Sequence, residues 1–258
     1  MRQPVLFVGH GSPMNAIEDN HFRREWQRLG DALPRPEAIL VISAHWETEG
    51  VAVTASERPR TIHDFGGFPP ALHAAQYPAP GSPALARRVA DLLAPEPVAQ
   101  DTGWGLDHGA WSVLLPMFPD AGIPVVQLSL AHDRDGAWHY ALARRLAPLR
   151  DEGVLILASG DMVHNLRLLR WPLAGPEPWA ARVQAQFNDW IRAGDHAALM
   201  AIEDAGPEAR LAVPTPEHYL PLLYALALQR EDDELVFFND QVLGSLSMTS
   251  LLLRPHAA

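Results

Sequence analysis

Three shortages narrow what this chain can be. It has no cysteine, which excludes disulfide bridges, thiolate zinc sites, iron–sulfur clusters and cysteine nucleophiles, so any metal ion must be held by nitrogen and oxygen atoms. Lys and Arg number 20 against 31 Asp and Glu, a net charge of −11 that argues against nucleic acid or an anionic membrane as a partner. No apolar run approaches the length of a membrane span, and the first residues do not resemble a signal peptide, so we expect a cytoplasmic protein.

The composition is typical of a globular domain. Hydrophobic residues make up 48% of the chain and charged residues 20%. A chain of 258 residues is long enough to bury a large core, and no repeat, low-complexity segment or linker divides it. We therefore expect residues 1–258 to form a single domain.

Short apolar runs bounded by turn residues alternate with helical patterns, which indicates an α/β fold with helices packed on a sheet. Near-continuous Val, Ile and Leu in several of the runs indicate strands that are covered on both faces. The last run alternates more with Ser, Met and Thr, so we expect it at an edge of the sheet. The expected strands are 5–9, 38–44, 51–56, 124–130, 154–159, 235–238 and 245–253.

Caps and apolar stripes predict the helices between the strands. Ser82 and Pro83 form a helix start, and stripes of large apolar residues follow within 138–149 and 179–190. Thr215 and Pro216 predict another helix, running to Leu228, with Glu217 and His218 in its first turn. Two segments rich in Gly, Pro, His and aromatic residues, 58–81 and 102–111, are typical of ordered loops near a site.

Histidines stand where three of the expected strands end. His10 follows the first strand, His45 ends the second, and His164 comes shortly after the run 154–159. Ligands in open α/β sheets bind along the edge where the carboxyl ends of the strands lie, and His218 can reach the same edge. A convergent set of imidazoles without cysteine suits Zn, Fe, Cu or Ni. The alternative is that each histidine only hydrogen-bonds the backbone of its own loop.

The full set of motifs resembles one family. In chain order the segments are GHGSPMNAIEDN (9–20), SAHWET (43–48), TIHDFGGFP (61–69), YPAPGSP (77–83), DHGAWSVLLPMFPDAGIPVVQLSL (107–130), SGDMVHNLR (159–167), PTPEHYLPLLYAL (214–226) and GSLSM (244–248). Together they are similar to class III extradiol ring-cleavage dioxygenases of the LigB type, in the 4,5-DOPA dioxygenase branch. The HGSP motif alone also occurs in tetrapyrrole chelatases, but a chelatase does not account for the other segments.

This resemblance implies a single three-layer α/β/α catalytic domain with a mixed, mostly parallel central sheet. It implies a non-haem Fe(II) oxidoreductase that opens the ring of a catechol such as L-DOPA with O2. The 4,5-cleavage product, a seco-DOPA, would cyclise to betalamic acid. The expected partners are therefore the small-molecule catechol and O2, and the chain is expected to be a monomer or a small homo-oligomer.

The resemblance also assigns site residues. His10, His45 and His218 match metal-binding positions, and His164 matches a fourth histidine at the metal that is a ligand, an acid/base, or both. Better-known members complete the metal site with a glutamate, which leaves open whether Glu217, next to His218, does so here. Histidine suits proton transfer because its ordinary pKa, about 6.5, is close to working pH.

Several loop residues are further candidates. His108 is a second possible catalytic histidine, and the alternative is a loop residue paired with Asp107. His63, Asp64 and Phe65 are candidates for substrate binding, with Phe65 and Phe68 as an apolar wall for the ring, against an alternative of simple loop packing. Asn165 could orient His164 through a hydrogen bond.

Two other functions fit the same histidines. Zinc is expected to be able to occupy an Fe(II) site built from imidazoles, so a zinc-dependent hydrolase on a similar scaffold is one alternative. A non-enzymatic metal-binding or redox-sensing protein is the other, by analogy of fold alone. The aromatic loop 61–69 favours the enzyme, because a metal store has no need of an organic pocket.

Overall fold

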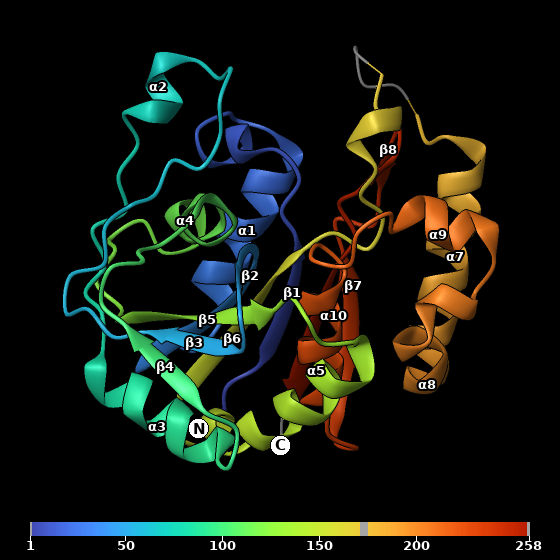
Figure 1. The fold of residues 1–258 in the computed structure, drawn as a ribbon. Helices are drawn as coiled ribbons and strands as arrows, with labels where there is room; N and C mark the ends of the chain where they lie inside the picture. The colour runs from blue at the N-terminus through green and yellow to red at the C-terminus, as the bar shows by residue number, and fades with distance from the viewer. Residues whose placement is uncertain (1, 171–174, 257–258) are drawn as a thin grey trace.

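An eight-stranded mixed sheet runs through the centre of the molecule in the computed structural model, which describes residues 2–170 and 175–256 (Figure 1). The strand order is β4-β3-β5-β2-β6-β1-β10-β7, and β8 and β9 form a separate two-stranded ribbon. The strands of the large sheet are β1 (Val5–Gly9), β2 (Ala38–Thr48), β3 (Val51–Thr54), β4 (Val98–Asp101), β5 (Val125–Ala131), β6 (Val154–Gly160), β7 (Asp233–Phe238) and β10 (Ser250–Pro255). The ribbon consists of β8 (Val242–Leu243) and β9 (Leu246–Ser247).

The middle of the sheet is parallel and its flanks contain antiparallel pairs. Strands β5, β2, β6 and β1 are neighbours with parallel pairing. Strand β10 is antiparallel to both β1 and β7, and β3 is antiparallel to β5 but parallel to β4. The predicted mixed, mostly parallel sheet is therefore confirmed.

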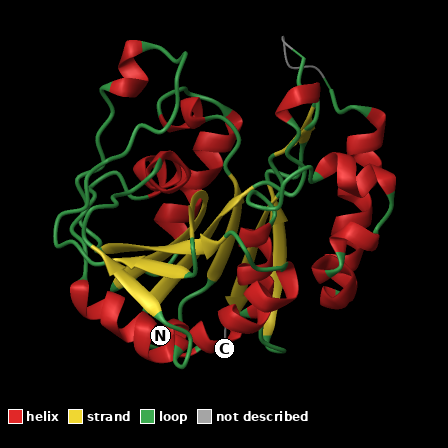
Figure 2. Ribbon diagram, viewed as in Figure 1, coloured by secondary structure: helices red, strands yellow, loops and turns green. Residues whose placement is uncertain are grey.

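Helices cover both faces of this sheet, as Figure 2 shows. Alternate residues of β1 point to opposite faces, so Val5 and Phe7 join one buried cluster while Leu6 and Val8 join the other. The cluster of Leu6 and Val8 is covered by α1 (His21–Ala32) and α4 (His108–Met117). The opposite cluster is covered by α3 (Pro83–Leu93), α5 (Gly136–Ala143), α6 (Pro148–Asp151), α7 (Pro178–Ala193) and α10 (Leu220–Ala227). The three-layer α/β/α architecture is confirmed.

Shorter helical segments complete the described chain. They are α2 (Pro70–His73), α8 (His196–Met200) and α9 (Pro207–Ala212), together with the 3-10 turns η1 (Pro13–Ala16), η2 (Arg144–Leu146), η3 (Leu166–Leu168) and η4 (Ile202–Asp204). None of the helices in the described parts of the chain combines the length and the apolar character that crossing a membrane requires.

The last predicted strand differs from the observed one. The run 245–253 is divided between β9 and β10, and β10 lies inside the sheet between β1 and β7 instead of at an edge. Its small polar side chains are buried and hydrogen-bonded: the hydroxyl of Ser250 accepts from Gly9 N at 3.0 Å and donates to the carbonyl oxygen of Met248 at 3.0 Å. The serines of this run suggested an exposed face of the sheet. In the structure they are buried instead, and hydrogen bonds within the protein satisfy their hydroxyl groups. One edge belongs to β4, which the pattern did not predict.

The helix predicted from Thr215 begins later, at Leu220. Pro221 is tolerated in the first turn of a helix but not further along, because it has no N–H to donate. The preceding residues form a turn in which Tyr219 N and Leu220 N both donate to the carbonyl oxygen of Pro216 at 2.9 Å. His218 therefore lies in a loop that leads into α10, and not in the helix.

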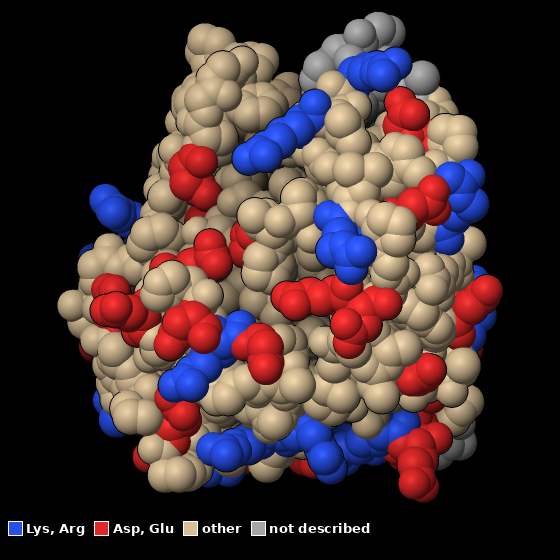
Figure 3. Space-filling model, turned by 45° about the vertical axis from the view of Figure 1, so that its right-hand side comes forward, with Lys and Arg blue, Asp and Glu red and all other residues tan. Residues whose placement is uncertain are grey.

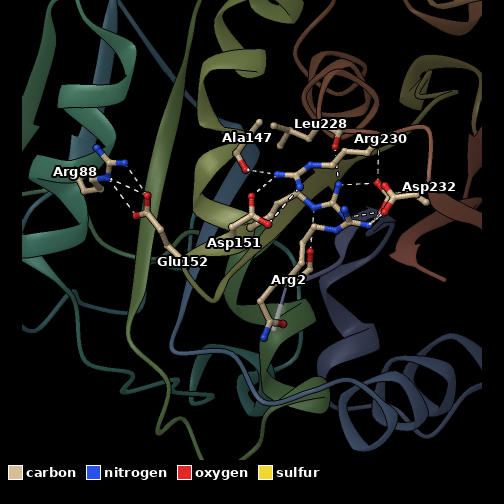
Figure 4. Close-up of polar contacts among 11 residues, drawn as sticks. Arg2, Arg88, Ala147, Asp151, Glu152, Leu228, Arg230 and Asp232 are labelled. Atoms are coloured by element: carbon tan, nitrogen blue, oxygen red, sulfur yellow. Dashed lines mark hydrogen bonds and ion pairs between the residues drawn. The ribbon is translucent and has the colours of Figure 1, made fainter. Parts of the chain in front are cut away.

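A buried ion pair joins the amino ends of β1, β6 and β7. The guanidinium of Arg150, at the end of α6, contacts both carboxylate oxygens of Asp233 at 2.6 and 2.8 Å, and both side chains are fully buried. Arg150 also donates to the carbonyl oxygens of Gln3 and Leu228. Figure 4 shows the surroundings of this pair, where the partly buried Arg2 contacts the exposed carboxylate of Asp232.

We expect Arg150→Met to lower the free energy of unfolding by about 3 to 5 kcal/mol, because Asp233 would keep a buried charge without its main partner. Urea denaturation followed by circular dichroism measures the change. The matched control is Arg88→Met, which removes an ion pair with Glu152 whose side chains are 44% and 38% exposed, seen apart from the others in Figure 4. The control should cost less than about 1 kcal/mol. Equal losses in the two variants would contradict this account of the buried pair.

Candidate active site

The parallel centre of the sheet brings four histidines to one edge. His10 directly follows β1, His45 lies within β2, and His164 follows β6, and these three strands are neighbours. His218 joins them from the loop before α10. The nitrogens of His10, His45 and His218 lie within 4.8 Å of one another, and Nε2 of His10 is 3.1 Å from Nε2 of His45.

Local backbone features aim these side chains. The register between β2 and β5 shifts between Ile42 and Glu47, which places an irregularity of the strand at His45. Such bulges re-aim side chains next to active sites. Glycine at position 160 lets the loop that carries His218 pack directly on β6. A side chain at this position would collide with the carbonyl group of His218.

Oxygen atoms behind the imidazoles fix how two of them point. The Ser159 hydroxyl donates to the carbonyl oxygen of Gly109 at 2.6 Å, so it accepts from Nδ1–H of His10 at 3.0 Å. Nδ1–H of His218 donates to Glu217 Oε1 at 3.1 Å. Each of these imidazoles therefore keeps its Nε2 unprotonated, which is the form that binds a metal ion.

Asp64 supports the third imidazole of the set. Its Oδ2 lies 3.6 Å from Nδ1 of His45 and 3.0 Å from Nδ1 of His108, and its Oδ1 accepts from the backbone N–H of His108 at 2.9 Å. Burial alone would raise the pKa of Asp64, but its bonds to His108 lower it. The carboxylate is therefore ionised between the two rings.

The electrostatics of the cluster suit a cation. Burial lowers the pKa of His10 and His45 well below 6.5, and the neighbouring imidazoles lower both further. Burial also lowers the pKa of His218, against the opposing effect of Glu217. Nε2 of His10 and Nε2 of His45 lie 3.1 Å apart, close enough for both to contact one ion at about 2.1 Å. The three residues fit a metal ion of the nitrogen-binding class.

Among the described residues, Glu217 is in none of the groups of potential ligand atoms that lie within 4.8 Å of one another. Its Oε1 accepts from His218 Nδ1 and, at 2.9 Å, from the hydroxyl of Thr215. Burial alone would raise its pKa, but these bonds and one from the backbone lower the pKa of Glu217 to about 2. The side chain is therefore an ionised support for His218.

Asp161 is a site residue that sequence reasoning missed. It directly follows β6 and is buried, and its Oδ2 has no hydrogen-bond partner and lies 3.5 Å from Nε2 of His10. Its other oxygen accepts from Gly11 N at 3.2 Å. The signal was present, because Asp161 stands at a strand end just as His10 does.

His164 lies beside the other histidines without belonging to the same group of nitrogens. Its ring stacks on that of His218 with centroids 3.5 Å apart, and its ligand atom groups with Asp161 and His218 but not with His10 and His45. Burial lowers the pKa of His164 to about 3. The side-chain amide of Asn165 donates to the carbonyl oxygen of Leu211, and its Oδ1 has no hydrogen-bond partner among the described residues, so Asn165 does not orient His164 as expected.

His108 begins α4 and pairs with Asp64, not with its neighbour Asp107. Asp107 caps the helix by accepting from Ala110 N, and it is held by Ser43 and Gln127. The His108 ring lies 3.8 Å from that of His45, so both imidazoles share one carboxylate.

A cavity of about 670 Å³ opens next to the histidines. Its wall includes His10, His45, His108, His164 and His218, together with the apolar side chains of Met14, Phe22, Phe65, Phe68, Leu166, Leu169, Leu243, Leu246 and Met248. Ser12, Asn15, Glu18 and Asn20 supply most of its other polar groups. The volume and the aromatic wall suit a small aromatic molecule placed against the imidazoles.

The three loop candidates for substrate binding take different places. Phe65 lines the cavity, with Phe68 beside it. His63 does not line it, because its Nε2 bonds to the carbonyl oxygen of Ala75 at 2.8 Å and fixes the loop. Asp64 stands behind His45 and His108. The structure therefore gives one of the three a direct position on the wall and gives the other two supporting positions.

Known proteins resemble this chain over nearly its full length. Residues 4–249 match the family model described as the catalytic LigB subunit of aromatic ring-opening dioxygenase. A 4,5-DOPA dioxygenase extradiol from Escherichia coli (strain K12) is 51% identical over 97% of this chain and 94% of its own length. A protein of the same name from Beta vulgaris is 42% identical over 89% of this chain and 88% of its own length.

A solved structure is also similar. The crystal structure of an uncharacterized protein from Escherichia coli K12 has a TM-score of 0.83 and 46% sequence identity, and the match covers 97% of this chain and 99% of that one.

We expect Glu217→Gln to weaken metal binding about 10- to 100-fold, because a neutral amide oxygen accepts a weaker hydrogen bond from Nδ1–H of His218 than the carboxylate does and no longer contributes a negative charge behind the imidazole. The measurement is a titration of metal-free protein with Zn²⁺ in competition with a chromophoric chelator. Glu231→Gln, an exposed position in the turn before β7, is the matched control and should leave the affinity unchanged. Unaltered affinity in the Glu217 variant would remove the supporting role assigned to this carboxylate.

Proposed function

The chain belongs to the LigB family of aromatic ring-opening dioxygenases, and from that premise we propose a non-haem Fe(II) enzyme that opens L-DOPA between ring carbons 4 and 5 with O2. The product would be a seco-DOPA that cyclises to betalamic acid. The observation that carries the proposal is the convergence of three imidazoles on an apolar cavity sized for an aromatic ring. The names of the Escherichia coli and Beta vulgaris relatives support the choice of substrate.

In this proposal His10, His45 and His218 hold the metal ion. A bound Fe(II) would bring both catechol oxygens and O2 together and let electrons pass between them. The three imidazoles suit this because they are neutral and at least partly buried. Ser159 and Glu217 hydrogen-bond His10 and His218 from behind, and Asp64 lies 3.6 Å from Nδ1 of His45. The ligand shell is thus arranged before substrate enters.

His164 is proposed as the acid/base. It lines the cavity beside His218, where a ring nitrogen can accept a proton from a catechol hydroxyl. Stacking on His218 fixes the plane of the ring. The same nitrogen can return the proton to the reacting oxygen later in the cycle.

His108 is proposed to assist from the neighbouring wall. The contact of its Nδ1 with Asp64 leaves Nε2 for a hydrogen bond to the reacting groups. Phe65 and Phe68 bound the same cavity and exclude water from the ring, which strengthens the polar contacts at the histidines.

The test uses metal-free protein reconstituted with Fe(II) under anaerobic conditions. We expect O2 uptake to match L-DOPA loss on aeration, and His10→Ala to abolish both metal binding and turnover. His164→Gln should keep metal binding but lower kcat about 10²- to 10⁴-fold, the usual contribution of a positioned acid/base. His21→Gln, on the exposed side of α1, is the control and should behave as the parent.

Two results would contradict the proposal. One is stoichiometric Fe(II) binding without O2 uptake on L-DOPA or any other simple catechol. The other is equal activity of the Zn²⁺ and Fe(II) forms, because zinc has no redox chemistry to offer.

A further inference from the structure

The wall of the cavity carries one formal charge apart from its histidines. Among the described residues that line it, Glu18 is the only Asp, Glu, Lys or Arg. Glu18 is exposed and lies shortly after η1, in the segment between His10 and α1. One carboxylate therefore sets the charge that the cavity presents to the side chain of a substrate.

The polar groups beside Glu18 are engaged within the protein. The amide nitrogen of Asn15 donates to the carbonyl oxygen of His10 at 3.1 Å, and that of Asn20 donates to Asn15 Oδ1 at 2.8 Å. The Ser12 hydroxyl accepts from Met14 N at 3.3 Å. Recognition of a substrate carboxylate needs a cation or several N–H donors, and this wall directs its side-chain amides elsewhere.

The nearby arginines do not line the cavity. Arg23 donates to the carbonyl oxygen of Ala16, and Arg24 contacts both carboxylate oxygens of Asp19 at 2.7 Å. Arg167 stands between two lining residues in the sequence but does not itself line the cavity.

The charge of the whole molecule acts in the same direction. Acidic residues outnumber basic ones by 31 to 20, and Figure 3 shows carboxylates spread across the middle of one face, with basic groups along its lower rim and others in its upper half. A negative protein attracts cationic ligands and repels anionic ones during encounter.

We propose that Glu18 makes the site selective for catechols whose side chain carries an ammonium group over catechols whose side chain ends in a carboxylate. The inference rests on the proposed function and adds to it the class of substrate. For a zwitterionic catechol amino acid it places the ammonium group toward Glu18 and leaves the carboxylate in solvent.

The test compares two catechols of matched length, 3,4-dihydroxyphenethylamine and 3-(3,4-dihydroxyphenyl)propionate, by the ratio of their kcat/KM values. The parent enzyme should favour the amine. Glu18→Gln should lower the ratio roughly 2- to 5-fold, as expected for a partly solvated charge pair, mainly through KM. Glu18→Arg should invert the preference, and higher ionic strength should weaken it in the parent.

Glu37→Gln is the matched control. It makes the same change of charge at an exposed position before β2, at the end of that strand remote from His45, and should leave the ratio as it is. An unchanged ratio in Glu18→Gln would overturn the proposal. So would a change of ratio in Arg167→Gln that exceeds the change in Glu18→Gln.

Binding to the Zn²⁺-loaded protein separates this inference from the proposed function. Calorimetric Kd values for the same two catechols report charge selection without turnover. If neither catechol is opened but the amine still binds more tightly and loses that advantage in Glu18→Gln, the proposed function fails and the selectivity stands. If both are opened with equal kcat/KM and equal Kd, the selectivity fails alone.

Discussion

The parallel pairing of β1, β6 and β2 is the constraint on which the site depends. Because these neighbours run in the same direction, their carboxyl ends meet at one edge, and the residues that follow them converge. His10 and His164 come from two of these ends, and the irregularity in β2 turns His45 toward them. The sheet thus brings together residues that are far apart in the sequence.

Burial and hydrogen bonding then give those histidines their chemistry. Desolvation keeps the buried imidazoles neutral, and the oxygens of Ser159, Asp64 and Glu217 lie at their Nδ1 atoms. A site arranged in this way has little to reorganise when a metal ion binds.

Part of this arrangement could be predicted from the sequence. An apolar run that ends in a histidine predicted His10 correctly at a strand end. The same pattern singled out His45, although β2 continues past it to Thr48. The partners behind them could not be read in this way. Asp64 reaches His108 across 44 residues through loop packing, and His218 leaves the predicted helix because Pro221 delays the start of α10. Such contacts depend on tertiary placement, which local patterns do not encode.

The most direct test of the central claim is an anomalous-scattering crystal structure of the protein loaded with Fe(II) under anaerobic conditions. The account predicts one ion within bonding distance of Nε2 of His10, His45 and His218, with Glu217 bound to the imidazole of His218 and not to the metal. An ion held instead by Asp161 and His164, or by the carboxylate of Glu217, would contradict it.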